Sequence, residues 1–270
     1  MGRDSVKSSQ LNFNRRWNPV TIWVDNQIVE PTTDFLSDDG WPLGQGIFET
    51  LRTEDGHVQL LMRHMRRAVS SGRSLAIPIP GEGRVEDAIS QLLNARSFAV
   101  GRLRLTFSQE HFIATHDEYT ESDEGLLIKT RESDGFAKGR QHKSFPYTKN
   151  LDALKLAKSE GFGEILYFDQ DMRISEGAVS NYAFRIDGQW ITTPISAGIL
   201  PGVIRALAIE RCDVLVRDLS LRDVAKADAA IAMSSLKIAK SVAAIDGRSL
   251  NQDDGVSRIC TKLRQTAASR

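Results

Sequence analysis

The chain has 270 residues, enough for one large domain or for two modest ones that each bury a core. Lysine plus arginine and aspartate plus glutamate both number 35, so no net field recruits nucleic acid or an anionic membrane. No apolar run approaches the ~20 residues of a membrane span, and the first residues carry neither a signal-peptide core nor a myristoylation motif, so we expect a cytoplasmic globular protein.

The first part of the chain alternates strand and helix signals. Residues 1–16 are polar, and we expect them to form a frayed tail. Residues 17–132 predict a small N-terminal α/β domain, with strands over residues 21–24, 28–29, 46–52, 58–61, 102–108 and 126–130 and helices over residues 61–75 and 85–93. Asp25-Asn26 and Asp55-Gly56 are turn pairs typical of β-hairpins. Residues 133–139 are the expected linker.

Residues 140–270 predict a larger C-terminal domain of mixed helices and strands. Helices are expected over residues 151–159, 203–211 and 256–263, and strands over residues 164–168, 182–186, 229–233 and 242–245. Pro201-Gly202 precedes the second helix, and such a helix start presents free backbone amides. Cys212 and Cys260 show no metal-ligand spacing, so we expect buried thiols and no metal site.

Lys143 and Glu176 are the candidate chemical centre. Lys143 lies in the polar run Gln-His-Lys-Ser-Phe-Pro-Tyr-Thr-Lys-Asn, where most lysines are solvated, and Glu176 begins the turn Glu-Gly-Ala-Val-Ser-Asn, where a carboxylate is ordinary. A lysine that forms a Schiff base with pyridoxal phosphate needs a carboxylate at the pyridine nitrogen, because the protonated ring is a better electron sink. This stretch can supply both groups.

The order of these motifs resembles that of the fold type IV pyridoxal phosphate enzymes, the class IV aminotransferase family. In that family a Schiff-base lysine is followed by a helix and then by a strand that ends in a Glu-Gly-x-x-x-Asn turn, which residues 176–181 fit. Lys149 competes with Lys143, but it is too close to Glu164 and would fall inside the helix. The resemblance covers residues 17–250 and implies a two-domain mixed α/β fold, a pyridoxal phosphate cofactor and a homodimer that acts on a small amino substrate.

Further segments resemble the family's phosphate-binding elements. Arg67 ends His-Met-Arg-Arg, which is similar to the family's His-x-x-Arg, and an arginine there can bind phosphate. The alternative is that Arg63, Arg66 and Arg67 form the solvated face of a helix, which we expect for at least two of the three.

The remaining phosphate-binding candidates lie near the end of the chain. Gly202, Val203 and Ile204 belong to a Leu-Pro-Gly loop, whose amides bind anions at a helix N-terminus. Ile204 stands where the family often has threonine, so one hydroxyl contact is missing. Ser234 and Ser235 resemble the last phosphate element, although Ser-Ser alone is more often a turn.

The resemblance also suggests a reaction. Residues 143–154 and the Ser-Ser-Leu-Lys at residues 234–237 look like the forms found in lyase members. This favours 4-amino-4-deoxychorismate lyase, which makes 4-aminobenzoate and pyruvate for folate biosynthesis. The alternative is a class IV aminotransferase that acts on branched-chain or D-amino acids with a 2-keto acid acceptor. A non-catalytic scaffold is a remote alternative, because Lys143 and Glu176 are both present.

Other residues have expected roles in either reaction. Tyr147 is expected to donate to the cofactor phenolate oxygen, with a buried core tyrosine as the alternative. Thr50 is a candidate proton donor, but on a hairpin half of the positions point the other way. Arg102, Arg104 and Lys237 are unranked candidates for binding the substrate carboxylates.

Overall fold

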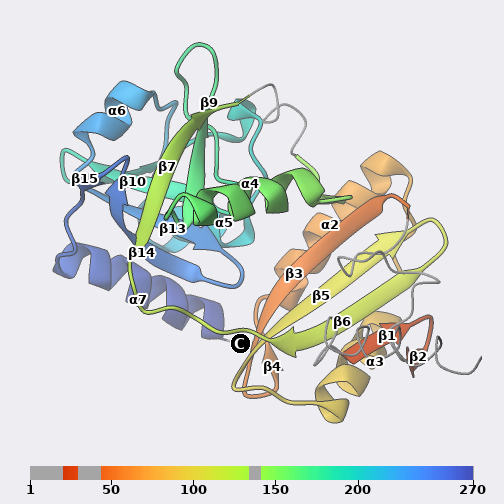
Figure 1. Cartoon of the computed structure of the whole chain (residues 1–270). Helices are drawn as coiled ribbons and strands as arrows, with labels where there is room; N and C mark the ends of the chain where they lie inside the picture. The colour runs from red at the N-terminus through yellow and green to blue at the C-terminus, as the bar shows by residue number, and fades with distance from the viewer. Residues whose placement is uncertain (1–20, 30–43, 134–140, 270) are drawn as a thin grey trace, which may run out of the picture. The chain divides into compact units, whose positions relative to one another are not determined.

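The computed structural model describes residues 21–29, 44–133 and 141–269 (Figure 1). The chain divides into two compact units, one comprising residues 1–58 and 67–120 and the other residues 59–66 and 121–270. The predicted tail over residues 1–16 and the predicted linker, apart from Ser133, lie outside the described residues. Among the described helices, none is long and apolar enough to cross a membrane.

The first unit contains an antiparallel sheet with strands in the order β2-β1-β6-β5-β3-β4. Its strands are β1 (Thr21–Val24), β2 (Gln27–Val29), β3 (Gly46–Glu54), β4 (His57–Val58), β5 (Val100–Ser108) and β6 (Phe112–Glu118). Both predicted hairpins are confirmed, and Asp25, Asn26, Asp55 and Gly56 have the positive φ angles that tight hairpin turns require. The strand after Asp55-Gly56 is shorter than predicted, because helix α2 (Leu61–Leu75) begins at Leu61.

The two faces of this sheet differ in chemistry, since side chains alternate along each strand. One face carries buried apolar residues such as Leu51, Leu103 and Leu105, and helix α3 (Glu82–Ala95) packs on β1 and β6. The opposite face carries Thr50 and Arg104, which are direct cross-strand partners in β3 and β5.

The second unit contains a mixed sheet in the order β12-β11-β10-β13-β14-β7-β9, with β15 beside β14. Its strands are β7 (Leu126–Glu132), β9 (Glu164–Phe168), β10 (Asn181–Ile186), β11 (Gln189–Thr192), β12 (Leu215–Val216), β13 (Ala229–Ser234), β14 (Ile238–Ile245) and β15 (Arg248–Ser249). Strand β7 was predicted to close the first half, and that prediction is wrong. It lies between β14 and β9, parallel to both, and such long-range pairing leaves no mark on the local sequence pattern.

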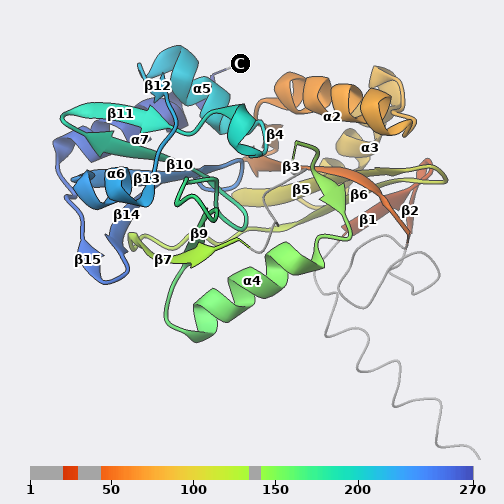
Figure 2. The same ribbon diagram turned by 90° about the horizontal axis from the view of Figure 1, so that it is seen from above.

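Helices cover both faces of the second sheet. They are α4 (Thr148–Ser159), α5 (Val203–Arg211), α6 (Leu221–Lys226) and α7 (Asp254–Ala268). Ser220 and Asp223 form a capping box at the start of α6. Figure 2 shows α5 beside α7, and α4 beside β9.

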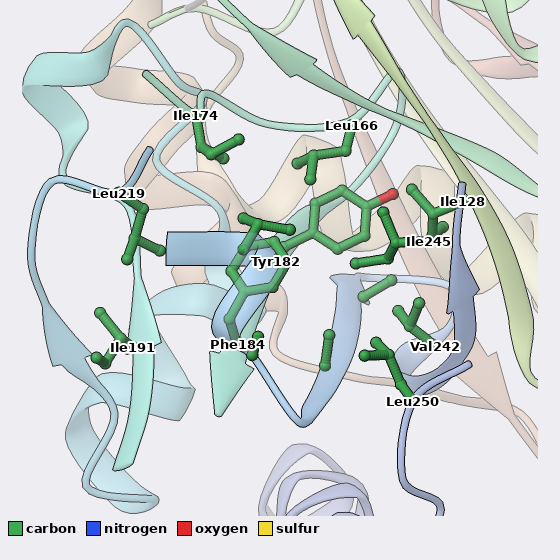
Figure 3. Packing of buried hydrophobic residues seen from close by; sticks show 14 of the residues in the cluster. Ile128, Leu166, Ile174, Tyr182, Phe184, Ile191, Leu219, Val242, Ile245 and Leu250 are labelled. Atoms are coloured by element: carbon green, nitrogen blue, oxygen red, sulfur yellow. The ribbon is translucent and has the colours of Figure 1, made fainter. Parts of the chain in front are cut away.

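The alternation along β10 and β13 divides the core of this unit. Tyr182 and Phe184 point into one buried cluster, which Figure 3 shows with Ile128 and Leu166. The intervening residues of β10 and β13 point to the other face, where a second cluster packs against α5 and α7. The loop between β9 and β10, which carries Glu176, therefore leaves a sheet that is packed on both faces.

Candidate active site

Glu176 is a buried carboxylate that the loop between β9 and β10 holds in one orientation. Only 5% of the residue is exposed. Its Oε2 accepts hydrogen bonds from Asn181 Nδ2 at 2.9 Å and from the Leu200 backbone N–H at 3.1 Å. Hydrogen bonds of this kind to an ionised oxygen are strong, so they stabilise the negative charge as well as the direction of the group.

Lys143 lies near the same loop, immediately before α4. Its Nζ is 4.9 Å from the ring centroid of Tyr147, and the Tyr147 hydroxyl donates to the Ala178 carbonyl at 3.1 Å. Ala178 is two residues beyond Glu176, so Tyr147 connects the lysine to the loop that carries the carboxylate. Lys149 is exposed inside the first turn of α4, as predicted from its spacing.

Arg205 is a buried cation whose charge interacts with that of Glu176. The residue is 5% exposed, and its Nε and Nη2 donate to the Thr193 carbonyl at 3.1 and 2.6 Å. Burial lowers the pKa of Arg205, and the negative charge of Glu176 opposes that effect. The sequence did not single out Arg205, although it lies directly after the Leu-Pro-Gly-Val-Ile segment.

The start of α5 offers backbone amides without a side-chain cap. Gly202 is the N-cap residue, with φ −65° and ψ 135°, and no side chain caps the helix there. A Cβ at Gly202 would lie 1.9 Å from Asn181 Oδ1, so the close approach of Asn181 requires glycine. Ile204, which replaces the expected threonine, is 2% exposed in the core cluster beside α5, so its side chain serves packing. The amides of Val203 and Ile204 still belong to the first turn.

Ser234 and Ser235 lie at the turn between β13 and β14. The Ser235 hydroxyl is 3.2 Å from Nε2 of His64, which is 1% exposed, and Ser234 Oγ accepts from the Lys237 backbone N–H at 3.3 Å. Sequence reasoning used His64 only as part of the His-x-x-Arg motif and missed its contact with Ser235. The structure thus brings together in the second unit Lys143, Glu176, Tyr147, the start of α5 and the two serines.

Arg67 belongs to the first unit and is held by a carboxylate. Its Nε and Nη2 donate to the two oxygens of Glu49 at 2.8 and 2.6 Å, and the two side chains are 10% and 2% exposed. Arg66 is exposed, and Arg63 forms a partly exposed ion pair with Glu210 in the second unit. The solvated-face alternative therefore does not describe Arg67.

The candidates for the substrate carboxylates have different surroundings. Arg102 is paired with Asp117, and Lys237 Nζ lies 3.7 Å from the fully buried Glu164. Arg104 has a pKa lowered to about 10, first by burial and then by the charge of Arg102, with the charge of Asp117 acting in the opposite direction.

These groups fit pyridoxal phosphate by their chemistry. Lys143 has a primary amine of the kind that reacts with an aldehyde, Glu176 has an anchored carboxylate of the kind that a pyridine nitrogen needs, and the start of α5 has amide donors of the kind that bind phosphate. The described residues contain no group of three His, Cys, Asp or Glu side chains that could bind a metal.

Residues 46–245 match the model of the amino-transferase class IV family. The chain belongs to this family.

Individual class IV relatives carry different activities in their names. A bifunctional aminodeoxychorismate lyase / D-amino acid transaminase from Mycobacterium tuberculosis is 24% identical, and the match covers 86% of this chain and 93% of that protein. An aminodeoxychorismate lyase from Bacillus subtilis is 29% identical, with coverage of 70% and 72%. Other relatives are named as branched-chain-amino-acid aminotransferases.

A solved structure shows the same fold. It is described as a hypothetical aminotransferase from Mycobacterium tuberculosis in a PLP-bound form, with a TM-score of 0.80 at 22% identity and coverage of 92% and 99%. The predicted mixed α/β fold of type IV pyridoxal phosphate enzymes is therefore confirmed.

Proposed function

We propose that this class IV enzyme is a pyridoxal phosphate-dependent lyase that converts 4-amino-4-deoxychorismate to 4-aminobenzoate and pyruvate in folate biosynthesis. The observation that carries the proposal is the shared anchoring of Lys143 and Glu176. Tyr147 contacts the lysine amine and donates to Ala178, two residues beyond the carboxylate. The reaction needs an amine and a fixed carboxylate of this kind.

Pyridoxal phosphate, when bound, supplies an electron sink for the substrate carbon that loses its proton. Lys143 would attach the cofactor and, once the substrate amine has replaced it, would remove the proton from the amine-bearing carbon. Glu176 would hold the proton on the pyridine nitrogen, and its donors Asn181 and Leu200 keep the carboxylate oriented for this role. Loss of this proton would allow the enolpyruvyl C–O bond to break and the ring to become aromatic. The departing enolpyruvyl group would take up a proton to become pyruvate, so no second substrate is needed.

The phosphate would be bound by backbone amides and hydroxyls. The amides of Val203 and Ile204 stand at the uncapped start of α5, where the helix dipole favours an anion. Ser234 and Ser235 add two partly buried hydroxyls, of which Ser235 is oriented by His64. We also propose Arg67 as a phosphate ligand because it ends the His-x-x-Arg motif, and Glu49 fixes the direction of its guanidinium.

Arg104 is the cation that we propose for a substrate carboxylate. Burial lowers the pKa of Arg104 to about 10, so a bound anion would stabilise its charge more than that of a solvated arginine. Thr50 lies directly across from Arg104, and we assign Thr50 a contact with the same substrate as a proton donor.

Two features favour the lyase over the aminotransferase. Residues 143–154 and 234–237 resemble the lyase-type form, and the Mycobacterium and Bacillus relatives described above as lyases carry that activity in their names. The aminotransferase remains the second candidate because the Mycobacterium relative is also named a D-amino acid transaminase. We further propose a homodimer, which light scattering would measure.

The acceptor requirement distinguishes the two reactions. Wild-type protein with pyridoxal phosphate should absorb visible light, Lys143→Ala should lose that band, and Lys149→Ala, on the exposed face of α4, should keep it. Aminodeoxychorismate should then yield equal amounts of pyruvate and 4-aminobenzoate with no 2-keto acid present. A strict requirement for a 2-keto acid would establish the aminotransferase, and a wild type without the band would indicate the scaffold.

A further inference from the structure

The buried residues Glu164 and Ser180 form a polar cluster with the partly buried Lys237, and the proposed reaction does not use this cluster directly. Glu164 is the first residue of β9 and is 0% exposed. Its Oε2 accepts from Ser180 Oγ at 2.9 Å and lies 3.7 Å from Lys237 Nζ. Lys237 Nζ also donates to Ser180 Oγ at 3.2 Å, so the serine hydroxyl bridges the two charges.

On one side, the cluster holds the loop that carries Glu176. Oε1 of Glu164 accepts from the Ala178 backbone N–H at 3.1 Å, while Oε2 binds Ser180. These contacts fall two and four residues after Glu176, and Ser180 directly precedes Asn181, the donor to the Glu176 carboxylate. The position of Glu176 therefore depends on Glu164.

On the other side, the cluster holds the turn that carries Ser234 and Ser235. Lys237 belongs to this turn, and its backbone N–H donates to Ser234 Oγ. The next residue, Ile238, is 2% exposed and has a φ of 54°, which is an outlier for a β-branched side chain. A strained residue of this kind persists only where its surroundings fix it, and the contacts of Lys237 are part of those surroundings.

Stability alone does not account for this ion pair. A buried pair has to overcome the desolvation of both charges, and apolar residues of similar volume often serve stability equally well. Burial raises the pKa of Tyr182, and the negative charge of Glu164 raises it further. What the ion pair provides and an apolar contact does not is a directional link between two loops.

We propose that Glu164 and Lys237 are positioning residues that set the distance between the Glu176 carboxylate and the Ser234-Ser235 turn. This inference rests on the proposed function, in which the first group binds the pyridine nitrogen and the second the phosphate. Without the pair, the pyridine nitrogen can still bind Glu176 and the phosphate can still bind the Ser234-Ser235 turn, but the two contacts are harder to form at the same time.

The test compares pyridoxal phosphate with pyridoxal, which lacks the phosphate. The dissociation constant of pyridoxal divided by that of pyridoxal phosphate measures how much the phosphate adds to binding when the pyridine end is bound as well. In Glu164→Gln and Lys237→Met we expect pyridoxal phosphate to bind about 10- to 100-fold more weakly, which is the scale seen when a residue that orients a metal ligand is lost. We also expect this ratio to fall. The double variant should lose less than the product of the two single losses, because the residues act as one unit.

Two further variants make the test decisive. Ser180→Ala removes the bridging hydroxyl without changing charge, so it should fold and should also lower the ratio. Arg185→Met breaks another ion-pair cluster of this unit, with Asp228 and Asp253, and should reduce thermal stability without changing the ratio. An unchanged ratio in the single variants and in Ser180→Ala, or an equal fall in Arg185→Met, would overturn the inference. A wild type that binds no pyridoxal phosphate would overturn the proposed function itself.

Discussion

The side-chain amide of Asn181 donates a hydrogen bond to the Glu176 carboxylate at 2.9 Å and another to the Leu200 carbonyl at 3.2 Å. Leu200 in turn donates its backbone N–H to the same Glu176 oxygen. Glu176 is thus fixed between its own loop and the segment that leads into α5. The Glu-Gly-x-x-x-Asn motif places the asparagine where it can orient the glutamate.

The first prediction concerns Asn181→Ala. Loss of the amide removes one hydrogen-bond donor from the buried Glu176 carboxylate, and removing a partner from a buried polar group costs about 1–3 kcal/mol. We expect the apoprotein to lose about that much free energy of unfolding, and pyridoxal phosphate to bind at least about 10-fold more weakly because each 1.4 kcal/mol is tenfold in affinity. Cofactor titration by absorbance and urea denaturation measure the two quantities. Wild-type affinity in this variant would show that Asn181 does not orient Glu176.

The second prediction concerns Gly202→Ala. The new Cβ would lie 1.9 Å from Asn181 Oδ1, so Asn181 or the start of α5 has to move. Overpacking of this kind costs about 1–3 kcal/mol of unfolding free energy, and cofactor affinity should fall with it, because Asn181 positions Glu176. Gly83→Ala is the matched control, since its Cβ meets no atom within 4 Å. That control lies in helix α3 and should gain up to about 1 kcal/mol. Equal stability of the two alanine variants would contradict the steric argument.

The local motifs were sufficient to propose Lys143, Glu176 and the start of α5 as site candidates. Each of these features depends on residues close in sequence, such as the lysine before a helix or the glycine before Val203. The exact bounds of α2 and α5 followed from helical spacing and from the Pro-Gly break for the same reason.

The features that sequence reasoning missed depend on distant residues. Glu164 and Lys237 are 73 positions apart, and only the parallel strands of the second sheet bring their surroundings together. Strand β6 was not predicted, because buried His116 and Asp117 interrupt its apolar alternation. The proposal of Arg104 also needed the structure, because it depends on the burial that lowers the pKa of this arginine.

The third prediction concerns Glu49→Gln. Glu49 and Arg67 form a bidentate pair with 2% and 10% of their side chains exposed. Breaking a buried ion pair by neutralising one member costs about 3–5 kcal/mol. We expect a loss of this size in the unfolding free energy of the first unit, measured by hydrogen exchange of the β3 and β5 amides. Asp152→Asn removes an exposed ion pair with Lys155 and should change stability by less than about 1 kcal/mol. A comparably small change in Glu49→Gln would mean that Arg67 finds another anion or remains solvated.

The fourth prediction concerns pH and His116, which is 0% exposed in β6. Its Nδ1 is 3.2 Å from the Arg96 carbonyl, which can only accept, so Nδ1 carries the hydrogen. Nε2 then accepts from the Thr53 hydroxyl at 2.9 Å. Burial lowers the pKa of His116, and the Arg96 carbonyl and the charge of Asp117 oppose that shift only in part. The folded chain therefore keeps His116 neutral under conditions in which the unfolded chain protonates it.

The sign of the pH effect follows from proton counting. The unfolded chain binds the proton as the pH falls through about 6.5, whereas the folded chain binds it only at lower pH. The stabilisation by neutral His116 is therefore fully present above about pH 6.5 and is lost as the pH falls toward the folded pKa, with a slope of up to about 1.4 kcal/mol per pH unit. Urea denaturation of wild type and His116→Gln between pH 5 and pH 8 should show a shallower slope in the variant. If His116→Gln kept the wild-type slope, another group would have to titrate in its place.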